Sequence, residues 1–159
     1  MLCTNFSLNS MAGVLSCLLF VSCVNLRISS IEDDGRQIPS NFGKDNITLL
    51  VIMKGKRSYD KYLEKNFKEN YFGNYIIITR RGLLDEQYRN TDKYKYIFDE
   101  ELHSEYSEKY GFHASAKFFL EDRNTGKKYI TRRGSSAFSK WMRAYIKELE
   151  KARQKNKRY

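Results

Sequence analysis

The sequence predicts an α/β domain that follows an N-terminal export signal, and three observations support this prediction. Two apolar, β-branched runs at 46–53 and 75–79 enclose a segment with helical periodicity. Two further strand-like runs flank a turn sequence at 124–126. All 29 Lys and Arg residues and all 19 Asp and Glu residues lie after residue 23, so the beginning of the chain is uncharged.

The uncharged beginning has the features of a bacterial lipoprotein signal peptide. An apolar run at 11–21 is shorter than the about 20 residues of a membrane-spanning helix, but it fits the hydrophobic region of a signal peptide. The string Leu19-Phe20-Val21-Ser22-Cys23 resembles a lipobox, which lipoprotein signal peptidase cuts before a cysteine that receives lipid. We therefore expect a signal peptide at 1–22, lipidation at Cys23 and a lipid-anchored location in the cell envelope. No Lys or Arg precedes the apolar run, so the alternative is a buried N-terminal helix or strand.

The chain behind the signal divides into three parts. The segment 23–45 is polar, contains the only proline, Pro39, and is predicted to be a tether. The segment 46–150 is long enough to bury the core of one domain. Residues 151–159 are predicted to form a basic C-terminal tail.

Cysteine usage restricts the chemistry of the mature protein. The three cysteines are Cys3, Cys17 and Cys23, all within the proposed signal and its cleavage site. Cleavage leaves only Cys23, whose sulfur is then bonded to lipid. The mature domain has no thiolate for redox or hydrolytic chemistry and no disulfide or cysteine ligand for a metal.

The first half of the domain is predicted to be a βαβ unit. A buried strand at 46–53 ends at Gly55, and Ser58 is expected to cap the following helix. The apolar residues of that helix fall on one face: Tyr59, Tyr62, Leu63 and Phe67. The second strand at 75–79 is expected to pair with the first in parallel, through a right-handed crossover.

The second half is predicted to contain three strands and two helices. Residues 80–93 are expected to form a loop with one or two helical turns, before a strand at 94–98. The segment 99–110 is predicted to be a short helix, because acidic residues suit its N-terminus and Gly111 follows it. The last two strands form a hairpin, from 116–120 to 128–131. The final helix is expected to begin near Ser135 or Ser136.

Several short motifs resemble the thioredoxin-like domains of peroxiredoxins and envelope thiol oxidoreductases. They are Phe98-Asp99, the run at 106–112, the run at 116–120 and Asp122-Arg123-Asn124-Thr125-Gly126-Lys127. The resemblance implies a three-layer fold: a central mixed sheet of about five strands with helices on both faces.

The resemblance also implies where a redox site would lie. In the family, cysteine occupies the N-terminus of the first helix, and a cis-proline lies beside it. The corresponding positions here are Gly55 and Ser58 for the first, and Ser115 and Ala116 for the second. Neither cysteine nor proline is present, so the resemblance implies a degenerate redox site, and no catalytic residue or cofactor is predicted.

The same loop is a candidate anion site. Lys54, Lys56 and Arg57 precede a helix N-terminus at which Ser58 is the expected cap, so cations and free backbone donors converge. The alternative is a solvated basic loop with a capping serine.

His103 lies within the predicted helix at 99–110 and His113 just after it, and both are expected to be surface or capping residues. His103 and His113 could in principle bind a metal with Glu101 and Glu105, but their spacing and the lack of cysteine do not favour it. No metal site is predicted.

The net charge of +10 favours anionic partners. For an envelope lipoprotein these are lipid headgroups and acidic polymers rather than nucleic acid. Three functions remain open: a non-catalytic thioredoxin-like lipoprotein that binds a protein or peptide, a basic module that binds anionic headgroups or polyanions, and a cytosolic nucleic-acid-binding protein with a misassigned N-terminus. The alternative to a specific anionic partner is a domain that its charge merely keeps soluble.

Overall fold

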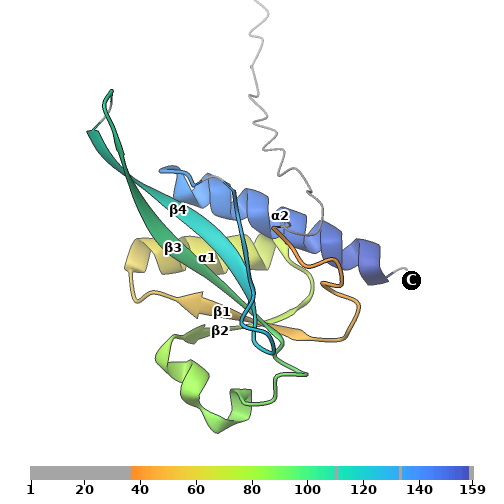
Figure 1. The fold of residues 1–159 in the computed structure, drawn as a ribbon. Helices are drawn as coiled ribbons and strands as arrows, with labels where there is room; N and C mark the ends of the chain where they lie inside the picture. The colour runs from red at the N-terminus through yellow and green to blue at the C-terminus, as the bar shows by residue number, and fades with distance from the viewer. Residues whose placement is uncertain (1–36, 110, 133, 158–159) are drawn as a thin grey trace, which may run out of the picture.

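The computed structural model describes residues 37–109, 111–132 and 134–157, which form an α/β domain (Figure 1). The predicted signal peptide at 1–22 and the lipidation site at Cys23 lie outside the described residues. Within the described residues, no helix is long and apolar enough to cross a membrane.

A five-stranded mixed sheet forms the centre of the domain, as predicted. The strands are β1 (Thr48–Met53), β2 (Asn74–Thr79), β3 (Tyr96–Ser107), β4 (Gly111–Asp122) and β5 (Lys128–Ile130). Their order in the sheet is β2-β1-β3-β4-β5. β1 runs parallel to β2 and to β3, and the pairs β3–β4 and β4–β5 are antiparallel. The predicted parallel βαβ unit is therefore confirmed.

The turn between β4 and β5 is also where the sequence places it. The Asp122 N–H donates to the Lys127 carbonyl at 2.9 Å, and the Gly126 N–H donates to the Asp122 carbonyl at 2.7 Å. Gly126 has a φ of 68°, a left-handed conformation that glycine adopts without strain.

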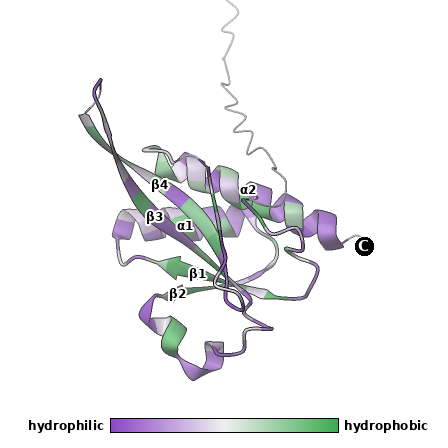
Figure 2. Cartoon of the chain, viewed as in Figure 1, coloured by the Kyte–Doolittle hydropathy of each residue, from purple (hydrophilic) through white to green (hydrophobic). Residues whose placement is uncertain are grey.

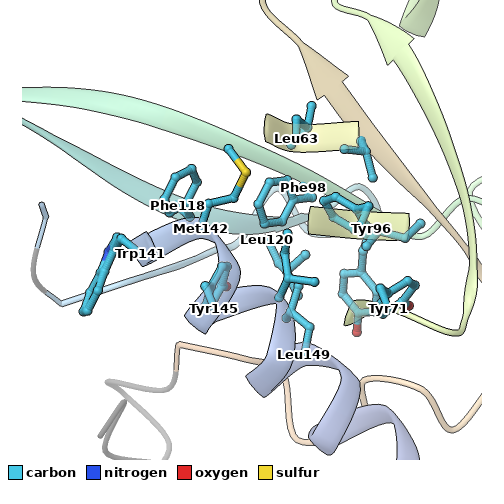
Figure 3. Packing of buried hydrophobic residues seen from close by; sticks show 14 of the residues in the cluster. Leu63, Tyr71, Tyr96, Phe98, Phe118, Leu120, Trp141, Met142, Tyr145 and Leu149 are labelled. Carbon is cyan, nitrogen blue, oxygen red and sulfur yellow. The ribbon is translucent and has the colours of Figure 1, made fainter. Parts of the chain in front are cut away.

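Both α-helices, α1 (Arg57–Asn70) and α2 (Phe138–Lys157), lie on the same face of the sheet. Figure 3 shows their side chains meeting those of β3 and β4 in one core. Its labelled members are Leu63, Tyr71, Tyr96, Phe98, Phe118, Leu120, Trp141, Met142, Tyr145 and Leu149. Helices were predicted on both faces; both α-helices lie on one face, and the other face carries only short 3₁₀ helices in the described chain.

The opposite face of the sheet is covered by the connection between β2 and β3. This connection contains two short 3₁₀ helices, η1 (Arg81–Leu84) and η2 (Glu86–Tyr88), which confirms the predicted loop with helical turns. A smaller core forms beneath it from Leu50, Ile52, Ile78, Tyr94 and Ile97, with Leu83 and Tyr88 packed against them.

The predicted helix at 99–110 is instead the continuation of a strand. β3 runs to Ser107 and pairs with β4 along all twelve of its residues. Pairing with β4 decides the conformation, because the apolar residues Leu102 and Tyr106 are four apart, a spacing that fits one face of a helix as well as one face of a strand. The acidic residues that resembled a helix N-terminus occupy the middle of this strand.

The ends of the domain also differ from the prediction. Residues 37–45 were expected to belong to a tether, but Phe42 is completely buried. α2 continues to Lys157, so most of the predicted tail is helical. The Asn156 amide donates to the carbonyls of Ser40 and Phe42, at 2.9 and 2.8 Å. These hydrogen bonds join residues 37–45 to the end of α2. The buried ring of Phe42 anchors residues 37–45 in the core.

Candidate functional site

Three charged side chains converge at the carboxyl ends of the parallel strands. Lys54 follows β1, Arg80 follows β2, and Asp99 lies in β3 where its pairing with β1 ends. The Lys54 Nζ lies 2.5 Å from the Asp99 Oδ1, and Arg80 forms an ion pair with the other carboxylate oxygen. The topology thus brings together three residues that are far apart in sequence.

Asp99 is the centre of this cluster, because its side chain is completely buried. Its carboxylate also accepts a hydrogen bond from the Glu100 N–H at 2.7 Å. Burial lowers the pKa of Lys54, even though nearby Glu100 acts to raise it. Burial raises the pKa of Glu100, although Lys54 and Lys56 oppose the shift. A buried carboxylate is tolerated here because two cations and a backbone donor satisfy it.

The predicted anion site is only partly assembled. Lys54 is occupied by Asp99 and by the Glu100 carbonyl, to which its Nζ donates at 3.0 Å. Ser58 is not the helix cap: Lys56 takes that position without a side-chain hydrogen bond, and Ser58 lies in the first turn. The remaining residues, Lys56, Arg57 and Ser58, are exposed. This exposure favours the alternative, a solvated basic loop, over a preformed anion site.

The positions of the degenerate redox site lie in separate elements. Gly55 forms the turn between β1 and α1 with a φ of 72°, and Ser58 is in α1. Ser115 and Ala116 are in the middle of β4, opposite His103 and Leu102 of β3. Among the described residues, no hydrogen bond or ion pair joins the two groups. Ala116 instead exchanges two backbone hydrogen bonds of 3.2 Å with Ser135.

The most prominent feature at this end of the domain is a β-hairpin arm, which we define as residues 100–117. Figure 1 shows it extending beyond the helices. The β1–β3 ladder ends at Phe98, and β5 pairs with β4 only at Phe119, Leu120 and Glu121. Apart from the bridge between Ala116 and Ser135, the outer edges of the arm have no strand partner in the described part of the chain.

One face of the arm is apolar and exposed. It carries Leu102, Tyr106 and Phe112, whose exposed fractions are 64%, 65% and 81%. The rings of Tyr106 and Phe112 contact each other across the two strands, with centroids 5.1 Å apart. Side chains of a strand alternate between faces, so this face continues the core face of Phe98 and Phe118. The apolar surface therefore runs from the core into solvent.

The other face of the arm is polar. His103 lies there with its Nε2 3.4 Å from the Glu101 Oε1. His103 and His113 are thus strand residues of the arm, whereas surface or capping positions at a helix were expected. The described residues contain no group of three or more His, Cys, Asp and Glu side chains that could hold a metal. Figure 2 shows both hydrophilic and hydrophobic colours along the arm, in contrast to the hydrophobic β1.

Two buried polar groups lie at the beginnings of the helices. The Tyr59 hydroxyl and the Trp141 indole N–H have no hydrogen-bond partner among the described residues. Tyr59 stacks on Phe138 at the start of α2, with ring centroids 6.0 Å apart. Figure 1 shows both helices beginning on the side from which the arm extends. Unsatisfied buried groups of this kind are uncommon in proteins.

The arm was missed in the sequence, although a signal for it was present. Phe112, Ala114 and Ala116 recur at every second residue, which is the strand period. Leu102 and Tyr106 are four residues apart, which is compatible with the same period. A helix was predicted instead because the acidic residues at 99–101 are typical of a helix N-terminus.

Comparisons with known proteins give no match that indicates a function. No protein family matches the chain, and no curated protein matches it. Among solved structures, it is similar to a dodecamer of a PelC variant from Paraburkholderia phytofirmans, with a TM-score of 0.38 and 12% sequence identity. That alignment covers 65% of this chain and 88% of the PelC chain. A likeness this distant supports no conclusion about fold or function.

Proposed function

We propose that this protein is a non-catalytic, lipid-anchored protein of the cell envelope that binds another protein or peptide through its β-hairpin arm. The observation that carries the proposal is the exposed apolar face of the arm at Leu102, Tyr106 and Phe112. Monomeric proteins rarely expose large contiguous apolar patches, and such patches mark interaction sites.

The backbone of the arm supports the same proposal. Its outer edges present N–H and C=O groups that no other described strand pairs. An unpaired edge beside an apolar face is the arrangement by which proteins bind extended peptides, because main-chain hydrogen bonds and side-chain contacts form together. The buried groups of Tyr59 and Trp141, without a partner among the described residues, belong to the beginnings of α1 and α2, and both helices begin on the side from which the arm extends.

Site-specific photo-crosslinking tests the arm directly. Phe112 is replaced by the photoreactive residue p-benzoylphenylalanine in cells, and adducts in the envelope fraction are identified by mass spectrometry. We expect one discrete protein adduct from position 112. The matched control is the same replacement at Thr125, an exposed residue of the β4–β5 turn. Equal labelling from both positions, or none from position 112, would reject the arm as a docking element.

The lipid anchor is a separate part of the proposal and has its own test. It rests on the apolar run at 11–21 and the lipobox-like string that ends at Cys23. We expect labelled palmitate to enter the wild-type chain but not Cys23→Ala, and globomycin to block cleavage. Palmitate incorporation that persists in Cys23→Ala would refute lipidation at Cys23.

A thioredoxin-like relationship is the finer interpretation of the α/β fold, and the proposed function does not depend on it. It is supported by the βαβ unit and by the turn at 122–127. The strand in place of the expected helix and the location of both helices on one face weigh against it.

A second candidate function is the binding of anionic headgroups or polyanions, and the distribution of charge favours it. The arm, residues 100–117, contains four acidic and two basic residues, for a net charge of −2. With +10 on the whole chain, the remainder carries +12. Binding of vesicles with anionic lipid should then fall steeply as salt rises, whereas docking on an apolar face should persist. Salt-independent binding would remove this second candidate.

A further inference from the structure

We propose that the partner of the arm is a second copy of this chain, and that the β3 edge of the arm adds to the free edge of β2. This inference rests on the proposed role of the arm as a docking element. It identifies the partner from three properties of the chain: an unprotected sheet edge, opposite charges on the two surfaces, and matching faces.

The first property is the edge of the sheet at β2. β2 is the terminal strand of the described sheet and pairs only with β1. Its sequence, NYIIIT, has no charged residue and no proline. Natural proteins usually protect an edge strand with charge, proline or a bulge, because an unprotected edge recruits another strand. The uncharged, isoleucine-rich edge of β2 is therefore suited to pairing.

The second property is charge. The arm carries −2, whereas residues 54–81, which include α1, β2 and the start of η1, contain eight basic and three acidic residues, for a net charge of +5. With Asp99, which pairs with Lys54 and Arg80, this region still carries +4. Two copies of this chain repel each other through their net positive charge. The acidic arm of one copy is nevertheless attracted to the basic region around β2 of the other. Such complementarity fixes orientation and suppresses other pairings.

The third property is the match of the faces. Tyr75 and Ile77 of β2 pack against the helix-side core, the face on which Leu102 and Tyr106 lie in the arm. Suppose that the apolar face of the arm continues the helix-side face of β2 in the other copy. The polar face of the arm then lies on the side of that copy's η1–η2 connection. Glu101 then comes to the side that carries the exposed Arg81. A single orientation satisfies both the apolar and the charged contacts.

The β3 edge of the arm is the edge that is free to pair. The β4 edge is occupied at its base by the bridge between Ala116 and Ser135. Along β3, the Lys54 Nζ donates to the Glu100 carbonyl at the base, and residues beyond Phe98 have no strand neighbour other than β4 in the described chain. Because the two paired surfaces differ, each copy retains one free arm or one free edge. The contact is heterologous and produces rings or open chains.

Disulfide trapping between two differently tagged copies tests the contact. Cys3, Cys17 and Cys23 are replaced by serine, which is straightforward because the chain has no other cysteine. One copy carries Ser104→Cys in the arm, and the other carries Thr79→Cys at the end of β2. Both positions lie on the helix-side face, and both are exposed. We expect a mixed disulfide dimer under mild oxidation, at a yield at least tenfold above that of Ser104→Cys with Thr125→Cys.

Sedimentation equilibrium of the full chain provides the second measurement. We expect association that weakens at least tenfold in the variant Tyr106→Ser/Phe112→Ser. Arg81→Glu should weaken it less, and Arg81→Glu combined with Glu101→Lys should recover part of the loss. Circular dichroism confirms that each variant is folded.

Three outcomes would overturn the inference. They are a disulfide that forms only between two Ser104→Cys copies, a chain that stays monomeric at about 200 μM with its arm intact, and association that is unchanged in Tyr106→Ser/Phe112→Ser. If the envelope adduct at position 112 is then a different protein, the proposed function stands and only the identity of the partner is refuted. If position 112 gives no adduct, both fail.

Discussion

Phe98 and Phe112 lie on the same face of the same β-hairpin, yet Phe98 is completely buried and Phe112 is 81% exposed. The hydrogen-bond ladder is continuous between them, and both strands alternate in the same way. What differs is the cover: Phe98 contacts Phe67 of α1 and Tyr145 of α2, with ring centroids 4.9 and 6.0 Å apart. The strand pattern therefore defines which face is apolar, while the extent of the helices decides where that face becomes exposed to solvent.

The largest expected effect is on the buried phenylalanine. Phe98→Ala should lower the free energy of unfolding by about 3–5 kcal/mol, because it removes a large side chain from a closed core. Phe112→Ala should change it by less than about 0.5 kcal/mol, because its ring is mostly in water. Urea denaturation of the two variants measures the difference. A large loss of stability in Phe112→Ala would show that the arm is packed against the domain.

The next effect concerns the base of the arm, where charge replaces apolar packing. Asp99→Asn should destabilise the domain by about 3 kcal/mol, because it leaves Lys54 partly buried without its counter-charge. The double variant Asp99→Asn/Lys54→Met should be more stable than the single variant. Thermal denaturation compares them, and Arg89→Met, at the exposed ion pair with Glu86, is the control with little effect. Additive losses in the double variant would contradict a coupled pair.

Glu150 provides a pH-dependent effect within the helix-covered part of the domain. Burial opposes its ionisation, but hydrogen bonds from Arg153, the Phe72 N–H and Gln154 lower the pKa of Glu150 below its ordinary value of 4.5. A lowered pKa in the folded state contributes stability that is present above the unfolded pKa and lost as pH falls through the folded pKa. Glu150→Gln should cost about 1–2 kcal/mol at pH 7.

That cost should shrink below about pH 4, where the wild-type carboxylate also becomes protonated. Denaturation midpoints at pH 7 and pH 3 measure the change. A cost that is equal at both pH values would mean that Glu150 acts through packing rather than charge.

The smallest expected effect is at Glu100, the first residue of the arm. Burial raises the pKa of Glu100, despite Lys54 and Lys56, so ionisation of this group is less favourable in the folded state than in the unfolded chain. Its contribution is present at low pH and lost as pH rises through the folded pKa. Glu100→Gln should therefore stabilise the domain at pH 7 by less than about 1 kcal/mol, with no gain at pH 3, as measured by thermal melts. A loss of stability at pH 7 would show that the attraction to lysine outweighs burial.

The parts of the fold that follow from local pattern were predictable from the sequence. The βαβ unit, the turn at 124–126 and the final helix all have apolar spacing or turn residues that define them without long-range information. The segment at 99–107 failed because two local signals conflicted, and the sheet partner in β4 decided between them. Phe42 was missed because Ile38 and Phe42, two apolar side chains in an otherwise polar run, are too few to define a periodicity.

The candidate site was less predictable for a related reason. Lys54 was identified as a cation in a loop, but its partner Asp99 is reached only when β1 and β3 become neighbours in the sheet. Arg80 joins them from a third strand end. The sequence therefore indicated the charges but not their neutralisation, and this changed the interpretation of the anion site.

The contact between residues 37–45 and the end of α2 has a mechanical consequence. For a chain anchored at Cys23, as proposed, tension from the membrane reaches the described part of the domain at Gln37, whose carbonyl accepts a hydrogen bond from the buried Tyr145 hydroxyl at 2.7 Å. The Asn156 amide adds two more attachment points further along. The load is thus carried first by α2 and shared among several bonds, and β1 is not peeled from the sheet. A chain shortened after residue 150 would lose the Asn156 attachments and transmit the load to the sheet at lower force.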